Sequence, residues 1–263
     1  MKLNTIYKLL VTSLTILFII GCNSLADTPS SSPIPSTPTP VVLISQKATL
    51  VSLPYIETHQ DPLFTITSQI PQLSGSDDPR VTAFNQILDK LIRKEMKSFS
   101  DEFLLYSATP IPTGSSLEAT YTLTAQYDDI WSFKLDFLFY YDNPARPGLY
   151  SIPINYDLAQ GKELVLNDLF LPNSNYLEAI SNYCVAELNK RNTTDDSIYG
   201  ATYPIPYNYQ NNWNITPEGL MITFNQTEVA PDEAGPQSVI VPYSELKDVI
   251  DSQGPLRNIN SNS

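Results

Sequence analysis

Two neighbouring segments alternate between apolar and polar residues, and this pattern constrains the fold more than any other feature. Apolar side chains recur at every second position over 117–127 and again over 131–141. Such a period of two is typical of a strand with one buried face. Asp128 and Asp129 separate the two segments and predict a tight turn, so the strands should form an antiparallel hairpin.

A helix is predicted after the first strands. Asp77 and Asp78 offer an N-cap before Pro79, a residue suited to a first helical turn. The apolar residues that follow recur at helical spacing, and they are Val81, Phe84, Leu88, Leu91 and Ile92. Three cations are expected near the C-terminal end of this helix, where they would suit its dipole, namely Arg93, Lys94 and Lys97.

The remaining elements follow from the same patterns. Further strands are expected at 48–57, 62–70, 149–158, 213–216, 219–229 and 239–241. A second helix is expected at 174–190, and its inner face would carry Leu177, Ile180, Cys184 and Leu188. A short helix should run from Pro242 to Ile250. The sequence therefore predicts an α+β fold of mostly antiparallel sheets, with two main helices and a short C-terminal helix.

The N-terminal segment has the pattern of a bacterial lipoprotein signal. Lys2 and Lys8 precede an apolar run at 9–20, which ends in Gly21 and Cys22. A retained membrane anchor is the alternative, but a spanning helix needs about 20 apolar residues and this run is shorter. We therefore expect an exported protein whose lipidated Cys22 attaches it to the extracytoplasmic face of a membrane, at the cell surface or in the periplasm.

The composition suggests five regions. Residues 1–21 would be the signal peptide, and 22–45 the lipidated cysteine with a linker rich in Pro, Ser and Thr. The ordered chain is then divided into an N-terminal α+β subdomain at 46–142 and a C-terminal one at 143–254. Residues 255–263 would form a polar tail.

Charge and cysteine content exclude several classes of protein. The net charge of −13 becomes −15 once Lys2 and Lys8 are removed, and no basic patch suited to nucleic acid is present. An acidic surface would attract a basic partner, although it could serve only to keep the protein soluble. After lipidation of Cys22 one other cysteine remains, Cys184, so the fold must depend on its core and not on an internal disulfide.

Three sequence blocks resemble a family of bacterial envelope domains of unassigned function. The blocks are IPQLSGSDDPRVTAFNQIL (70–88), INYDLAQGKELVLNDLF (154–170) and WNITPEGLMITFNQTEVAPDEAGPQSVIVPYSEL (213–246). Members of this family form the extracellular part of the anti-sigma factor RsiV and the N-terminal part of the peptidoglycan deacetylase PdaC. The resemblance implies a non-catalytic, RsiV-like ectodomain. In RsiV that role is recognition of lysozyme, a small and very basic secreted enzyme.

No motif for catalysis is present. A Ser-His-Asp or Cys-His arrangement needs a histidine, and the chain has one, His59, in a segment between two predicted strands. We predict no cofactor and no metal site, because zinc requires a cluster of Cys and His that the chain lacks. A carboxylate-dependent hydrolase remains an alternative, since such an enzyme needs only two acids placed across a cleft.

Two surfaces are candidates for contact with a partner. The first is the polar region at 199–213, whose aromatic residues could anchor a protein or stack on sugars, with Tyr203, Tyr207 and Trp213 as the chosen contacts. They could equally pack under the loop as a small cluster. The second is the loop around 228–236, with Glu228, Asp232 and Glu233. The leading hypothesis is a surface-tethered recognition module for a basic secreted protein, with peptidoglycan or another glycan as the alternative ligand.

Overall fold

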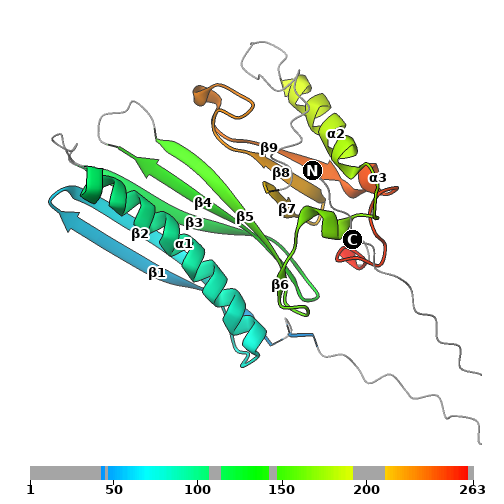
Figure 1. The fold of residues 1–263 in the computed structure, drawn as a ribbon, viewed down its shortest axis with the longest axis horizontal. Helices are drawn as coiled ribbons and strands as arrows, with labels where there is room; N and C mark the ends of the chain where they lie inside the picture. Colours follow the sequence, from blue (N-terminus) through cyan, green and yellow to red (C-terminus); the bar gives the residue numbers. More distant parts are fainter. Residues whose placement is uncertain (1–42, 45–46, 107–113, 142–146, 192–210, 260–263) are drawn as a thin grey trace, which may run out of the picture. The chain divides into compact units, whose positions relative to one another are not determined.

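A six-stranded sheet and one long helix form the first half of the fold (Figure 1). The structure is a computed structural model that describes residues 43–44, 47–106, 114–141, 147–191 and 211–259. The strands lie in chain order, and neighbouring strands are antiparallel except for the parallel pair β2 and β3. Their bounds are β1 (Thr49–Gln60), β2 (Leu63–Ser74), β3 (Ser115–Tyr127), β4 (Ile130–Tyr140), β5 (Gly148–Asp157) and β6 (Lys162–Glu163).

The parallel pair exists because a helix connects its two strands. Helix α1 (Pro79–Tyr106) carries the chain back along the sheet between β2 and β3, as a parallel crossover requires. The Asp78 carboxylate accepts the backbone N–H of Arg80 at 2.9 Å and so caps the helix as predicted. One face of α1 packs on the sheet, and its buried apolar residues are Val81, Phe84, Leu88, Ile92, Met96 and Phe99.

The predicted place of the cations in this helix is wrong. Helix α1 continues to Tyr106, so Arg93, Lys94 and Lys97 lie in its middle and its last turn carries no basic residue. They form ion pairs with neighbouring acids on the exposed side of the helix instead.

The predicted hairpin is confirmed. Strands β3 and β4 pair antiparallel over their whole length, with a register shift between Leu123 and Ala125. The turn between them begins at Asp128, whose φ of 47° lies in the left-handed region that Asp tolerates better than most residues. Odd-numbered residues of β4 face α1 and form the core between the helix and the sheet, among them Phe133, Leu135 and Phe137.

The second half of the fold combines a three-stranded antiparallel sheet with helix α2. This sheet has the order β7-β8-β9. Cys184 lies on the buried face of α2, as predicted, together with Ile180 and Leu188. The elements are η2 (Leu166–Leu169), α2 (Tyr176–Arg191), β7 (Trp213–Ile215), β8 (Gly219–Phe224), η4 (Asp232–Ala234), β9 (Gln237–Pro242) and α3 (Tyr243–Leu246).

Two of these elements are shorter than predicted. Strand β8 ends at Phe224, because the next residues turn and hold each other through side-chain hydrogen bonds. Helix α3 ends at Leu246, and turns follow it. Residues 255–259 are the described start of the predicted polar tail. They pack instead on the apolar core between α2 and the three-stranded sheet, which we call the second core, with Leu256 and Ile259 buried.

A buried polar junction joins the two sheets. Ser132 of β4 is fully buried, and its hydroxyl donates to Oδ1 of Asn155 at 2.6 Å. The Ser132 hydroxyl oxygen accepts Nδ2 of Asn214 at 3.0 Å and the backbone N–H of Ile215 at 3.1 Å. Asn155 in turn donates to the carbonyl of Trp213 at 2.8 Å. These bonds connect β4 and β5 directly to β7, so buried polar groups fix how the two sheets meet.

The five predicted regions stay a prediction. Strand β5 lies beyond the predicted boundary at residue 142 and pairs with β4, so the six-stranded sheet takes strands from both predicted subdomains. Residues 1–21 lie outside the described residues, as do Cys22 and nearly all of the linker at 22–45. No helix in the described part of the chain is long and apolar enough to cross a membrane.

Candidate functional site

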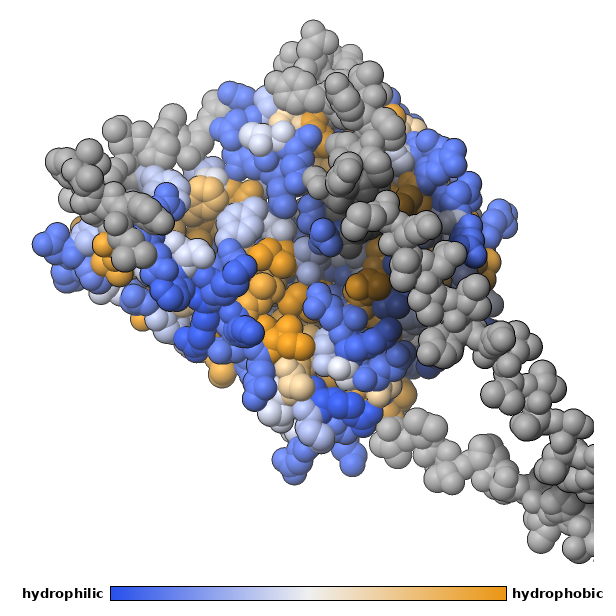
Figure 2. All heavy atoms as spheres, in the orientation of Figure 1, coloured by the Kyte–Doolittle hydropathy of each residue, from blue (hydrophilic) through white to orange (hydrophobic). Residues whose placement is uncertain are grey.

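Two adjoining hollows lie at one end of the six-stranded sheet and share three aromatic side chains, Phe139, Tyr141 and Tyr150. We call these two hollows the aromatic groove. The larger, of about 400 Å³, is also lined by residues 147–149, 225–227 and Asp232. The smaller, of about 300 Å³, is also lined by Glu95, Ser98, Phe99, Glu102 and Leu117. Figure 2 shows one face of the molecule, on which hydrophobic residues reach the surface between hydrophilic ones.

A glycine allows the aromatic rings to take these positions. Gly148 is the register partner of Phe139 across β4 and β5, and an added Cβ would lie 1.9 Å from Cζ of that ring. The Phe139 ring therefore lies directly over the glycine. Its centroid is 5.4 Å from that of Tyr141 and 6.2 Å from that of Tyr150. These are ordinary separations for interacting aromatic rings, so the three side chains support one another.

Helix α1 supplies two carboxylates to the aromatic groove. The Tyr150 hydroxyl donates to Oε2 of Glu95 at 2.8 Å, and the Tyr141 hydroxyl donates to Oε2 of Glu102 at 2.6 Å. Burial is the main cause that raises the pKa of both tyrosines above the usual range, and the neighbouring glutamates add to it. The phenols therefore remain neutral hydrogen-bond donors, and they bond to the carboxylates without cancelling their charge.

The segment after β8 forms one wall of the groove through a pair of side-chain hydrogen bonds. Asn225 and Gln226 accept the backbone N–H groups of Ser151 and Leu149, each at 2.8 Å. They thereby occupy the edge of β5 as a neighbouring strand would. We call this pair the edge clip.

Two of the predicted contact residues brace the edge clip. Glu228 accepts the backbone N–H of Asn225 at 2.8 Å, and Asp232 accepts Nε2 of Gln226 at 2.6 Å. Asp232 also lines the larger hollow, and Glu233 beside it is exposed. The structure thus brings Asp232 to the aromatic groove, whereas Glu228 has a supporting role.

The other predicted contacts are not at this groove. Trp213 is only 2 % exposed and packs in the second core, so its ring offers no stacking surface to a ligand. Tyr203 and Tyr207 lie outside the described residues, as does Cys22. Sequence reasoning missed the aromatic groove because Phe139 and Tyr141 continue the alternation of a core strand. A usable signal was present in Glu95 and Glu102, seven residues apart on one helix face and beside that hairpin.

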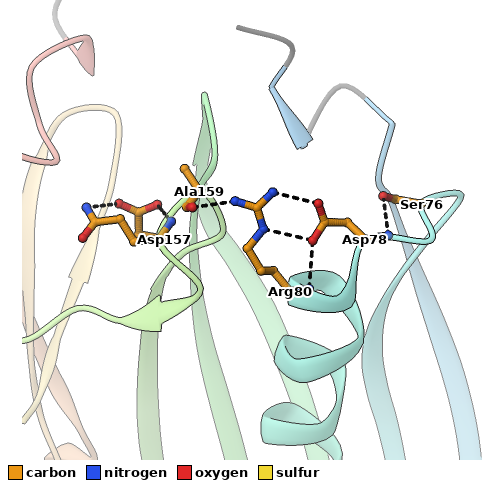
Figure 3. Close-up of polar contacts among 6 residues, drawn as sticks. Ser76, Asp78, Arg80, Asp157 and Ala159 are labelled. Carbon is orange, nitrogen blue, oxygen red and sulfur yellow. Dashed lines mark hydrogen bonds and ion pairs between the residues drawn. The ribbon is translucent and has the colours of Figure 1, made fainter.

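The opposite end of the sheet also carries charged residues, but there they bond to one another. Nε and Nη2 of Arg80 donate to the two carboxylate oxygens of Asp78 at 2.9 and 2.8 Å, and Nη1 donates to the carbonyl of Ala159 at 2.6 Å (Figure 3). These bonds hold the pKa of Asp78 down at about 2. Asp157 accepts both the backbone and the side-chain N–H of Gln160. We call this the Arg80 end.

The groove lies at the end of the sheet away from the point where the chain enters it. Leu43 lines two hollows at the Arg80 end, one of about 500 Å³ with Asp78 and one of about 310 Å³ with Asp157. Strand β4 alone spans 11 residues, which is roughly 35 Å at about 3.3 Å per residue. The aromatic groove is therefore separated from the Arg80 end by the length of the strands.

The residues considered for catalysis have structural environments. His59 stacks on Phe64 with the ring centroids 4.9 Å apart, and its Nδ1 lies 2.8 Å from the Pro62 carbonyl. Cys184 is fully buried, and burial raises the pKa of its thiol to about 12, so it is protonated and unreactive near neutral pH. Within the described ranges, no group of three or more His, Cys, Asp or Glu residues is placed to hold a metal ion.

Comparison with known proteins relates this architecture to one family. Residues 167–244 match the family described as protein of unknown function (DUF3298). The matched region begins in η2 and ends in α3, and it contains the edge clip. A crystal structure of a DUF3298 protein from Bacteroides fragilis aligns with a TM-score of 0.63 and 16 % identity, covering 81 % of this chain and 98 % of that one. A DUF3298 protein from Pseudomonas aeruginosa aligns with a TM-score of 0.56 and 16 % identity, covering 78 % and 94 %.

The curated relatives cover less. The immunogenic proteins MPB64 of Mycobacterium bovis and MPT64 of Mycobacterium tuberculosis are 29 % identical over 96 residues, which is 36 % of this chain and 42 % of theirs. The chain thus matches less than half the length of those proteins. Together the matches show that the chain shares its fold with DUF3298 proteins and that residues 167–244 resemble this family of unknown function, while the closer resemblance to RsiV and PdaC stays a prediction.

Proposed function

We propose that the protein is a non-enzymatic recognition module for a basic secreted protein, of which a lysozyme-type wall hydrolase is the leading example. Lipidation of Cys22 would attach it to the extracytoplasmic face of a membrane. The observation that carries the proposal is the aromatic groove. It presents three aromatic rings beside the carboxylates of Glu95, Glu102 and Asp232, and aromatic residues are common anchors of protein interfaces.

The charge of the chain supports a basic partner. The net charge of −13 acts over the whole molecule and would steer a cationic protein towards it. At the Arg80 end the acid Asp78 is neutralised locally by a cation. At the groove Glu102 is bonded by a neutral tyrosine, so its negative charge is available to a partner.

Calorimetry of the purified full chain with lysozyme tests this proposal. We expect micromolar or tighter binding at physiological salt and tighter binding still at low salt, because added salt screens the long-range attraction. Acetylated lysozyme, which has lost its lysine charges, is the matched control and should bind at least tenfold more weakly. No binding at either salt concentration would reject a lysozyme-type partner, and equal binding of the two forms would reject attraction to its lysine charges.

Peptidoglycan or another glycan is the second candidate ligand, because exposed aromatic rings can also stack on sugars. Trp213 is buried, and Tyr203 and Tyr207 lie outside the described residues, so among the described residues this alternative rests on Tyr141 and Tyr150 in the groove. Pelleting of the full chain with purified cell wall tests it. Tyr150→Ala should release the chain from the pellet if sugars bind here, and unchanged pelleting would exclude the groove as the glycan site.

A further inference from the structure

We propose that the aromatic groove binds two arginine side chains of the partner, placed about 10 Å apart. One guanidinium would stack against the Tyr150 ring and bond to the Glu95 carboxylate, and the second would stack against the Tyr141 ring and bond to the Glu102 carboxylate. This inference rests on the proposed function and specifies the chemistry of its site. It would also hold for a basic partner other than a lysozyme.

Each of the two glutamates has a second carboxylate oxygen that a guanidinium could bond to. Each uses Oε2 to accept a tyrosine hydroxyl. Among the described residues no group bonds Oε1 of Glu102, and Lys94 reaches Oε1 of Glu95 at 3.3 Å with a side chain that is 70 % exposed. A hydrogen bond between a cationic donor and a carboxylate is roughly twice as strong as one between neutral groups. A cation from a partner can therefore bind Glu102 directly and must displace Lys94 to bind Glu95.

The aromatic rings favour arginine over lysine. A guanidinium is planar and weakly hydrated, and it stacks on aromatic faces while it bonds to a carboxylate. The three shared rings line both hollows, and the carboxylates of α1 line the smaller one. The chain already shows such a contact elsewhere, because the guanidinium carbon of Arg93 lies 5.5 Å from the ring centroid of Tyr55.

The spacing follows from helix geometry. Glu95 and Glu102 are seven residues apart in α1, which at about 1.5 Å per residue places them about 10 Å apart along one face. In a polyproline II segment, which has three residues per turn and rises about 3.1 Å per residue, side chains at positions i and i+3 lie on the same face about 9 Å apart. A peptide with arginines at positions i and i+3 therefore matches the two carboxylates, whereas adjacent arginines do not.

Calorimetric titration of the full chain with short peptides tests the inference. The probe is an acetylated, amidated Arg-Gly-Gly-Arg peptide, and the comparison peptides carry adjacent arginines, two lysines, or two citrullines at the same spacing. We expect the spaced arginine peptide to bind at least fivefold more tightly than each of the others. Citrulline keeps the shape without the charge, so equal binding of that peptide would overturn the inference.

Variants of the chain locate the site. Glu102→Gln should weaken the spaced peptide about tenfold, and Glu95→Gln should weaken it less because Lys94 already competes there. Lys94→Gln should tighten binding two- to threefold. Glu118→Gln is the matched control, since it removes the same charge from an exposed position on β3, and it should change the affinity less than twofold.

The outcomes separate this inference from the function that it extends. If lysozyme binds but Glu102→Gln and Glu118→Gln affect it equally, the proposed function stands and the groove assignment is wrong. If the spaced peptide binds and lysozyme does not, the groove assignment stands and the partner is another basic protein. Binding of sugar oligomers that survives Glu102→Gln and is lost in Tyr150→Ala would overturn the arginine assignment in favour of a glycan.

Discussion

The two ends of the six-stranded sheet use carboxylates in different ways. At the Arg80 end, Asp78 bonds to a guanidinium, so the charges of both groups cancel where they lie. At the aromatic groove, Glu102 bonds to the neutral hydroxyl of Tyr141, which satisfies one oxygen and leaves the charge in place, while Glu95 bonds to the Tyr150 hydroxyl and also to Lys94. The charge of the hydrogen-bond donor therefore decides whether a paired carboxylate can still attract a cationic ligand. A cationic donor gives a structural contact, and a neutral donor gives a contact that can also attract a ligand.

The largest expected effect comes from the buried polar junction that joins the two sheets. Ser132→Ala deletes the hydroxyl that joins β4 and β5 to β7, leaving the buried Asn155 with fewer partners. We expect a loss of about 2–3 kcal/mol in the free energy of unfolding, measured by urea denaturation. Ser52→Ala makes the same chemical change at an exposed hydroxyl and should cost under about 0.5 kcal/mol. Similar losses for the two variants would show that the junction does not hold the sheets together.

Two glycines, one at each end, compare crowding with backbone strain. Gly161 has φ of 66° and an added Cβ would lie 3.2 Å from Cγ of Arg80, whereas Gly235 has φ of 64° and open space around it. Gly235 also has ψ of −170°, a combination that is nearly confined to glycine. Gly235→Ala should therefore cost about 1–3 kcal/mol from backbone strain alone, and Gly161→Ala about 1 kcal/mol with a few tenths more because Arg80 must shift. A smaller loss for Gly235→Ala in thermal denaturation would contradict this account.

The edge clip should matter at the groove end alone. Asn225→Ala removes the acceptor of the Ser151 N–H, and we expect a loss of about 1 kcal/mol in the free energy of unfolding. Amide hydrogen exchange gives the local result: the Ser151 amide should exchange faster, while amides at the Arg80 end, such as that of Gly161, keep their rates. If all amides accelerate equally, the clip is part of the global fold and not a separate wall of the groove.

The smallest effect should appear at the Arg80 end, as a function of pH. The pKa of Asp78 is about 2 in the folded chain and therefore below its ordinary value near 3.8. A lowered pKa stabilises the fold above the ordinary value, and this contribution is lost as the pH falls through about 2. Asp78→Asn keeps the helix cap but loses the ion pair. Its melting temperature should fall below that of the parent chain at pH 5–7, and the two should converge near pH 2.

A second variant controls for the helix cap in that experiment. In an Arg80→Gln background, the Asp78→Asn change should no longer give a pH-dependent difference, because the partner of the carboxylate is gone. Binding of the spaced arginine peptide should change less than twofold in all of these variants. A tenfold loss of binding would mean that the two ends are not independent.

Much of the fold could be predicted because local patterns determine it. The alternation at 117–127 and 131–141 located the hairpin, and Asp78 with Pro79 located the start of α1. The parallel pairing of β2 and β3 was not predicted, although a strand, a helix and a strand in succession favour it. The length of α1 was also missed, since Arg93, Lys94 and Lys97 resemble the end of a helix and are in fact paired with acids along its side.

The candidate site was less accessible to sequence reasoning. The aromatic groove combines α1, the ends of β4 and β5 and the segment after β8, which are distant in the sequence. A tyrosine at a strand end looks the same whether it closes a core or borders a hollow, and only packing decides between them. Trp213 shows the opposite error, because a tryptophan beside a polar region suggested exposure and tertiary packing buried it.

The position of β1 has a mechanical consequence. All twelve residues of β1 pair with β2, and the strand begins at the end of the sheet where the chain enters and runs towards the groove end. A molecule held through its N-terminal segment and pulled by a partner at the groove would be loaded along its strands. β1 would then have to slide past β2 with every pair strained at once, instead of peeling away one pair at a time. This geometry suits a domain that must stay folded and bound while its partner exerts a pulling force.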